Sequence, residues 1–283
     1  MTDKRRARRG QRRGTDGAEA LDGRSSLVTA RAFDSIYARR CRDRLIDRLD
    51  LESVAEPEAR EWATTAFIGP GEPAELCRVL SRAREAGRPQ FTILDLGCGT
   101  GGIGRYVAKR LDAEVWGVDF SQVALELARR RNAVSPKLVA ADMSALPFPR
   151  SAVHAAYSFD ALYLARDKAQ ALRELGRVLS SGAPLAFTLY AETDRRGRAC
   201  NAWRSALEDA GFEVRAWADR SRRWRALMRR KHERRLAAAS RLLAADGPEI
   251  GAELAVSRTM LGLNGEPAFL DRHRRLWVWA AKA

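Results

Sequence analysis

The 283-residue sequence has few cysteines and no long apolar run, and both absences narrow its class. Its four cysteines show neither CxxC spacing nor the density of a disulfide framework, which argues against zinc ribbons and disulfide-stapled secreted domains. No apolar stretch approaches the roughly 18 residues of a membrane span. The basic N-terminus lacks the apolar segment of a secretory signal. We therefore expect a cytoplasmic protein without a metal site or a membrane partner.

Acidic residues are outnumbered, with 36 Asp and Glu against 51 Lys and Arg and a formal net charge of +15. Two short segments carry almost all of the excess. Residues 1–13 hold seven basic residues and one acid, and residues 220–235 hold nine basic residues and one acid. The rest of the chain is close to neutral, so the global charge is a weak argument for a nucleic-acid partner.

The pattern of apolar residues divides the chain into five segments. Residues 1–25 contain hardly any apolar side chains and are predicted to form a disordered basic tail. Residues 26–88 are predicted to be helical, residues 89–219 alternate short apolar runs with helical stretches, residues 220–262 form a charged helical segment, and residues 263–283 contain a last strand. The alternation favours an α/β fold with a parallel sheet and helices on both faces.

The most informative stretch is I-L-D-L-G-C-G-T-G-G at residues 93–102. Glycines that follow a strand allow a tight turn and let a ligand approach the backbone. The spacing matches neither G-x-G-x-x-G nor a Walker motif, so a phosphate cradle is not indicated. Asp119 ends the next apolar run, where a carboxylate can accept both hydroxyls of a ribose. An ordinary turn between a strand and a helix is the alternative interpretation.

Three further motifs stand in order after this loop: V-D-F-S at 118–121, A-D-M-S-A-L-P-F at 141–148 and E-L-G-R-V-L at 174–179. With them, residues 90–218 resemble the class I S-adenosylmethionine-dependent methyltransferases, in particular the small-molecule, natural-product branch. The resemblance implies a Rossmann-like seven-stranded sandwich, with residues 26–88 as an N-terminal lid and residues 220–262 as a substrate cap. It also implies S-adenosylmethionine as the cofactor and methyl transfer to N, O or C of a small molecule such as a specialised metabolite.

The resemblance assigns the cofactor site position by position. The loop would line the methionine part of the cofactor, Asp95 would hold its amino group, and Asp119 would take the ribose hydroxyls. The other assigned residues are Gly97, Cys98, Gly99 and Gly101 in the loop, Phe120 and Met143 at the adenine ring, Asp142 at the adenine amino group, and Ser158 and Tyr37 at the methionine end. A structural role for Ser158 and a core position for Tyr37 remain as alternatives.

A general base is harder to assign. Many relatives have a histidine soon after the fourth strand, in a pattern like A-L-Y-H, but this chain has A-L-Y-L at 161–164. Asp160, Tyr163 and His232 remain as weak catalytic candidates. The apolar Leu164 at this position favours a pocket that recognises its acceptor by shape. Such an acceptor would already be nucleophilic when it binds.

Two other functions stay open. The basic segments permit an RNA methyltransferase, although no N-P-P-Y-like motif follows the fourth strand. The missing histidine permits a protein that binds S-adenosylmethionine but catalyses another reaction, such as cyclisation. Trp224, Leu227 and Met228 share one face of a charged helix, which could pack on the body, contact an acidic substrate or nucleic acid, or bind a partner. We expect this helix to pack on the body. We also expect a small-molecule acceptor rather than nucleic acid, and a chain that is a monomer or a homodimer.

Overall fold

The computed structural model describes residues 33–34, 37–38, 44–53, 68–69, 71–84, 91–131, 136–193 and 198–283. The predicted tail at residues 1–25 lies outside them. The α-helices are α3 (Leu45–Glu52), α4 (Glu72–Leu80), α5 (Gly102–Leu111), α6 (Gln122–Arg131), α7 (Lys168–Val178), α8 (Arg198–Asp209), α9 (Ser221–Ala237), α10 (Ala239–Asp246), α11 (Gly251–Leu261) and α12 (Phe269–Arg272). The strands are β1 (Thr92–Leu96), β2 (Glu114–Asp119), β3 (Lys137–Ala140), β4 (Ala155–Ser158), β5 (Pro184–Glu192), β6 (Phe212–Asp219) and β7 (His273–Lys282).

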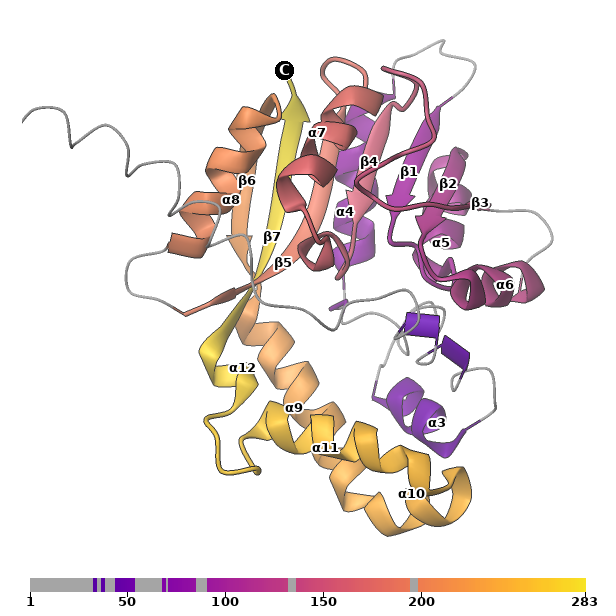
Figure 1. Ribbon diagram of the computed structural model, residues 1–283, viewed down its shortest axis with the longest axis vertical. Coiled ribbons are helices and arrows are strands. Elements are labelled where there is room, and N and C mark those ends of the chain that lie inside the picture. The colour runs from indigo at the N-terminus through magenta and orange to yellow at the C-terminus, as the bar shows by residue number, and fades with distance from the viewer. Residues whose placement is uncertain are drawn as a thin grey trace, which may run out of the picture.

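The seven strands form one sheet in the order β3-β2-β1-β4-β5-β7-β6. Strands β1 to β5 pair in parallel, and β7 pairs antiparallel with both β5 and β6. The predicted α/β fold is confirmed. Because parallel strands end at the same edge, the turns after β1, β2, β3 and β4 are brought together, and Figure 1 shows this edge facing α9 to α12.

Alternating side chains of the central strands fill two apolar cores. Leu94 and Leu96 of β1 pack with α7 and α8 on one face, whereas Ile93 packs with α4 and α5 on the other. Figure 1 shows α7 and α8 in front of the sheet and α4 behind it. Since both faces of the central strands are covered, most of their side chains are apolar, as expected for a parallel sheet.

Helix α7 shows how local sequence sets these covering elements. The Asp167 carboxylate accepts a hydrogen bond from Gln170 N at 2.8 Å and caps the first turn. The buried side chains recur at helical spacing: Ala171, Leu172, Leu175 and Val178. The helix therefore presents one apolar stripe to the sheet.

Helices α9 to α12 stand between β6 and β7 and form a separate lobe, which we call the cap (Figure 1). Trp224 and Met228 of α9 are buried with Leu270 of α12, next to Tyr190 of β5. The expected packing of the charged helix on the body is thus present. In the part of the chain that the structure describes, no helix has the length and apolarity to cross a membrane. The same residues contain no cluster of three or more His, Cys, Asp or Glu side chains that could bind a metal ion.

Candidate active site

The glycine loop after β1 turns sharply against β2. Gly97, Gly99 and Gly101 have φ values of +75°, +53° and +72°, a region that side chains with a Cβ rarely adopt. The amides of Gly97 and Cys98 both donate to the carbonyl of Val118, at 2.7 and 3.0 Å. The loop backbone is therefore fixed at the end of β2, with three backbone conformations that favour glycine.

Two of these glycines also leave room for neighbouring side chains. A Cβ at Gly97 would collide with the Cβ of Ala161, which follows β4. A Cβ at Gly99 would lie 2.6 Å from the Tyr37 hydroxyl. The loop thus meets the end of β4 on one side and the predicted lid residue Tyr37 on the other.

Asp119 joins the glycine loop to the turn after β2. Its Oδ2 accepts from Gly99 N at 2.8 Å and its Oδ1 accepts from Ser121 N at 2.9 Å. Burial raises the pKa of Asp119, and these backbone amides oppose that shift. Each carboxylate oxygen has a second lone pair, so the group can still accept hydrogen bonds from a ligand.

Asp95 is buried near the end of β1, and none of the residues that the structure describes gives it a cationic partner. Burial raises its pKa to about 7; the nearby Tyr157 hydroxyl opposes the shift and the Asp119 carboxylate adds to it. Its Oδ2 has no hydrogen-bond partner of normal geometry among the described residues. A Cβ on Gly104 would lie 3.2 Å from this oxygen, so α5 can approach it closely. A buried carboxyl group whose pKa is raised and whose oxygen lacks a partner in the described residues is suited to bind a positively charged ligand.

Phe33 and Asp34 of the N-terminal segment contact the turn after β2, one through its aromatic ring and the other through its carboxylate. The Phe120 ring lies 5.4 Å from that of Phe33, which lies 6.4 Å from that of Tyr37. Ser121 Oγ donates to Asp34 Oδ1 at 2.5 Å, and Val123 N donates to the same oxygen at 3.3 Å. Asp34 therefore accepts hydrogen bonds at the start of α6 and holds the segment that carries Tyr37.

The remaining predicted cofactor residues differ in their surroundings. Met143 lies close to Gly97, with its Cε 3.5 Å from where a Cβ would be, and Asp142 is exposed beside it. The Cys98 side chain lies against Gly117 of β2. Ser158 is fully buried, donates to Leu96 O at 2.8 Å and accepts from Leu162 N at 3.0 Å. Its hydroxyl thus links the ends of β1 and β4.

The catalytic candidate Asp160 belongs to a buried charge network. Arg275 of β7 lies between Asp160, at 3.3 Å, and Glu72 of α4, at 2.7 Å. Thr188 Oγ1 donates to Asp160 Oδ1 at 3.0 Å and accepts from the amide of Asp160 at 2.8 Å. Asp160 also has a φ of +52°. These contacts hold the carboxylate in place below the turn that follows β4.

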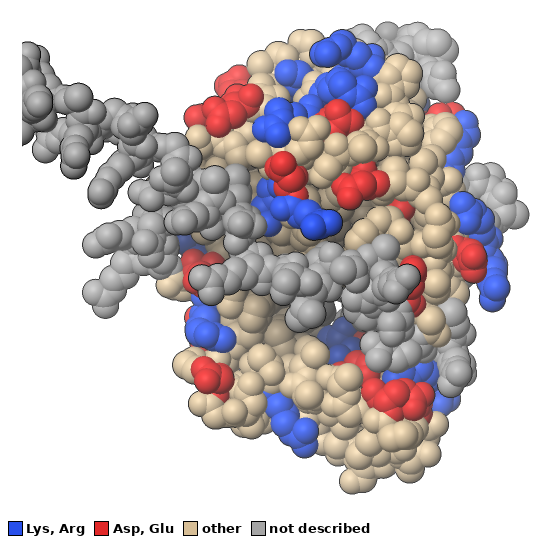
Figure 2. All heavy atoms as spheres, in the orientation of Figure 1, with Lys and Arg blue, Asp and Glu red and all other residues tan. Residues whose placement is uncertain are grey.

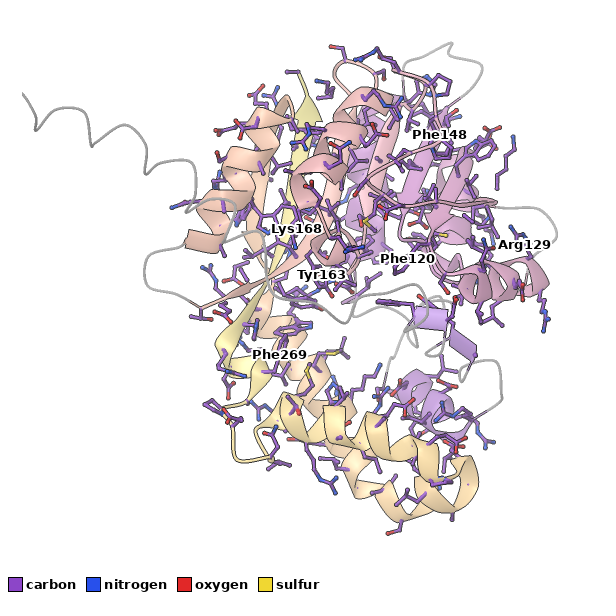
Figure 3. All side chains as sticks on the ribbon, in the orientation of Figure 1. Phe120, Arg129, Phe148, Tyr163, Lys168 and Phe269 are labelled. Carbon is purple, nitrogen blue, oxygen red and sulfur yellow. The ribbon has the colours of Figure 1, made fainter. Side chains whose placement is uncertain are left out.

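Tyr163 begins an aromatic wall that runs from the core to the cap. Its ring lies 5.0 Å from Tyr190, whose ring lies 5.0 Å from Trp224 and 6.4 Å from Phe269. Figure 3 shows Tyr163 at the side of the core that faces the cap and Phe269 at the near end of the cap. Burial and the Asp160 carboxylate raise the pKa of Tyr163, so its phenol stays protonated at neutral pH.

The third catalytic candidate, His232, lies within the cap and not at the sheet edge. Ser257 Oγ donates to Glu253 O at 3.0 Å, so it must accept from His232 Nδ1, 3.0 Å away. This assignment leaves a lone pair on Nε2, which has no partner among the described residues. Burial, Arg235 and Lys231 lower the pKa of His232 to about 3. The ring is therefore neutral.

Sequence reasoning missed several residues that shape this site. Thr188 and Tyr190 of β5 and Arg275 of β7 contact Asp160, and Glu72 of α4 joins them through Arg275. One signal was available: Arg275 directly precedes the apolar run L-W-V-W-A-A, and an arginine that is buried with such a run needs an acidic partner. Nothing in the sequence identified which acid.

The fold and the site define a class I S-adenosylmethionine-dependent methyltransferase, and comparisons with known proteins agree. A family model described as a methyltransferase domain matches residues 93–182. Malonyl-acyl-carrier-protein O-methyltransferase of Methylococcus capsulatus is 30% identical over 187 residues, covering 62% of this chain and 67% of that protein. The chain belongs to this methyltransferase family, and the resemblance inferred from its sequence is confirmed. The glycine cradle fits the family's cationic cofactor, and so does the buried Oδ2 of Asp95, which has no hydrogen-bond partner in the described part of the chain.

Further similar proteins include a second protein of that name and two solved structures of other enzymes. The protein of the same name in Halorhodospira halophila is 32% identical over 164 residues, covering 57% of this chain and 50% of that protein. The chain thus spans about half the length of several curated relatives. The solved structure of the 4+2 cyclase SpnF is 25% identical, with a TM-score of 0.60 and coverage of 74% of this chain and 80% of that one. Cyclopropane synthase MmaA2 from Mycobacterium tuberculosis is 14% identical, with a TM-score of 0.66 and coverage of 91% and 100%, and shares the fold.

Proposed function

We propose that this protein transfers the methyl group of S-adenosylmethionine to a small molecule bound between the core and the cap. The observation that carries the proposal is the continuous edge made by the glycine loop, Asp119 and the N-terminal segment. There Asp119 would take the ribose hydroxyls, Phe120 would lie against the adenine, and Asp142 and Met143 would bound it. Asp95 would face the methionine amino group, with Tyr37 closing that end.

The acceptor would lie against the aromatic wall of Tyr163, Tyr190 and Phe269. The cofactor's sulfonium makes its methyl group electrophilic when bound, so the protein must chiefly hold the nucleophile in line and exclude water. Aromatic side chains at a partly buried surface favour a ligand with substantial apolar or ring surface. We infer an acceptor of this kind, such as a specialised metabolite methylated at N, O or C.

No strong general base would be required. The Asp160 carboxylate is engaged by Arg275 and Thr188, and Tyr163 is held protonated. His232 is neutral but lies inside the cap. We therefore infer that Asp160 and Tyr163 shape the acceptor site, and that the acceptor reaches it as a free amine, an enol, an activated phenol or a similar nucleophile.

The arginines of the cap support a small acceptor rather than nucleic acid. Arg225 donates to the carbonyls of Leu270 and His273 at 2.7 and 2.9 Å, and Arg229 lies 3.3 Å from Asp271. Arg235 is buried in an ion pair. On the face shown in Figure 2, acidic side chains lie among the basic ones. Much of the local positive charge therefore has partners within the protein.

A second candidate is a cofactor-binding cyclase. The likeness to the 4+2 cyclase SpnF, together with the absence of a histidine after β4, favours this alternative. In that case the aromatic wall would order a flexible substrate, and the cofactor would remain unconsumed.

Calorimetry with S-adenosylhomocysteine tests the cofactor site. Replacing Asp119 with Ala should weaken binding by about 10- to 100-fold, or roughly 1–3 kcal/mol, because polar groups lose their acceptor. The matched control is Asp209→Ala, at an exposed position at the end of α8, which should bind like the wild type. Unchanged affinity in the Asp119 variant would contradict the assignment.

Turnover then separates the two functions. Candidate acceptors with ring systems and free amine, phenol or enol groups would be incubated with S-adenosylmethionine. Formation of S-adenosylhomocysteine with one methylated product supports methyl transfer. Conversion of an acceptor with the cofactor intact would favour the cyclase.

A further inference from the structure

Asp50 of α3 is buried in an ion-pair cluster against the cap helix α9. Its Oδ2 lies 3.0 Å from Lys231 Nζ, and its Oδ1 accepts from Arg235 Nε at 2.9 Å. Arg235 Nη2 also donates to Oδ2. Burial would raise the pKa of Asp50, but the two cations outweigh it and hold the pKa below its usual range. A buried carboxylate between two cations fixes the position of α3 on the cap.

Two further sets of contacts fasten α3 to the same lobe. The amides of Leu45 and Ile46 donate to the two carboxylate oxygens of Asp246, at the end of α10, at 2.8 and 3.0 Å. Ile46 is buried with Leu242, Ile250 and Leu254, which belong to the cap and its connecting turn. Helix α3 is therefore part of the cap in space, although strands β1 to β6 separate them in sequence.

The preceding part of the same N-terminal segment contacts the cofactor edge. Asp34 accepts from Ser121 and Val123 at the start of α6, and the Tyr37 hydroxyl lies over Gly99. Only residues 38–43 separate Tyr37 from Arg44, and a chain of this length spans at most about 25 Å. One short segment thus touches the cofactor edge with one end and the cap with the other.

We propose that Asp50 is a positioning residue that couples cofactor binding to the cap. A bound cofactor holds Asp34 and Tyr37 against the cofactor edge, and α3 passes this restraint through Asp50 to Lys231 and Arg235 of α9. The same helix places Trp224 against Tyr190 at the acceptor site. The acceptor then binds to a cap that is already ordered. Less of its binding free energy is therefore spent on ordering the cap helices. This inference rests on the proposed function for the identity of the cofactor.

Hydrogen exchange of the full chain, with and without saturating S-adenosylhomocysteine, tests the coupling. In the wild type, the ligand should slow exchange in α9 and α11 as well as in the core, by about tenfold. In Asp50→Asn, core protection should remain and the cap protection should disappear. The matched control is Asp271→Asn, which removes an exposed cap ion pair with Arg229 and should keep the coupling.

Each outcome has a separate meaning. Protection of the cap that persists in Asp50→Asn would show that coupling passes through β6 and β7, and would overturn the proposal. If that variant exchanges its cap freely without ligand, Lys231→Met replaces it, since it removes one of the two ion pairs of Asp50 and leaves the pair with Arg235. There too the cap protection should fall, and unchanged protection overturns the proposal. Binding without cap protection in the wild type contradicts the coupling alone, whereas absence of binding contradicts the proposed function as well.

Discussion

Two buried aspartates, Asp95 in the core and Asp50 at the cap, have opposite electrostatic surroundings. Asp95 has no cationic partner among the described residues, and burial raises its pKa to about 7. Asp50 is equally buried, but Lys231 and Arg235 outweigh the effect of burial and lower its pKa. Desolvation acts on both carboxylates, so the neighbouring charges decide the direction of the shift.

The difference separates a functional region from a structural one. At the cofactor edge, an unsatisfied acid makes the ligand-free protein less stable and is suited to a cationic ligand. In the cap, a fully paired acid fixes three charged groups and joins α3 to α9. The cap combines the ion pairs of Asp50 with a small apolar cluster, whereas Asp95 lies in a core with much larger apolar clusters.

The largest expected effect comes from breaking the cap's ion pairs. Asp50→Asn leaves Lys231 and Arg235 buried without their carboxylate, and should destabilise the cap by about 3–5 kcal/mol. Exchange rates of cap amides in low denaturant measure this loss. Asp271→Asn, at an exposed pair, should cost no more than about 1 kcal/mol. Equal effects in the two variants would mean that burial of Asp50 has no special importance.

The same substitution in the core should have the opposite sign. Asp95→Asn removes a carboxylate that is costly to ionise, and should stabilise the ligand-free protein by about 4 kcal/mol near pH 8. It should also weaken S-adenosylhomocysteine binding. Urea denaturation without ligand and calorimetry with ligand check both parts. Destabilisation of the ligand-free protein by Asp95→Asn would contradict this prediction, because it would mean that the ionised carboxylate is stabilised in the folded protein.

A smaller effect is expected from pH. Since the folded pKa of Asp95 is raised, its contribution to stability is complete below about pH 4 and is lost as the pH rises through about 7. Lowering the pH from 8 to 5 should therefore stabilise the core by roughly 2 kcal/mol, and Asp95→Asn should abolish this gain. The lowered pKa of Asp50 has the reverse consequence: its contribution is present above about pH 4 and is lost in stronger acid. Urea unfolding across this range tests both signs, and a core with flat pH dependence would contradict the first.

Much of the core could be predicted from the sequence. The predicted alternation of short apolar runs and helical stretches over residues 89–219 is present as strands and helices in the structure, because apolar runs and the turns that end them are local features. The order of strands and helices then brings the strand ends together. For this reason Asp95, Asp119 and the glycine loop could be predicted to share one edge before their contacts were known.

The cap could be predicted only as a charged helical segment. Trp224 and Met228 indicate one apolar face, but the same helix also buries Lys231, His232 and Arg235. Local hydropathy places such residues in solvent. The burial of Lys231 and Arg235 depends on their ion pairs with Asp50, which belongs to a different part of the chain.

The sequence by itself determined the α/β alternation, the glycine loop and the strand-end acids, because backbone conformation and strand polarity follow from neighbouring residues. Tertiary structure alone decided that Arg275 lies between Glu72 and Asp160, that Asp34 contacts Ser121, and that α3 joins the cap. The physical reason is that a charge can be buried only where a partner meets it. Such partners are brought together by packing across the fold, and no local pattern specifies which ones meet.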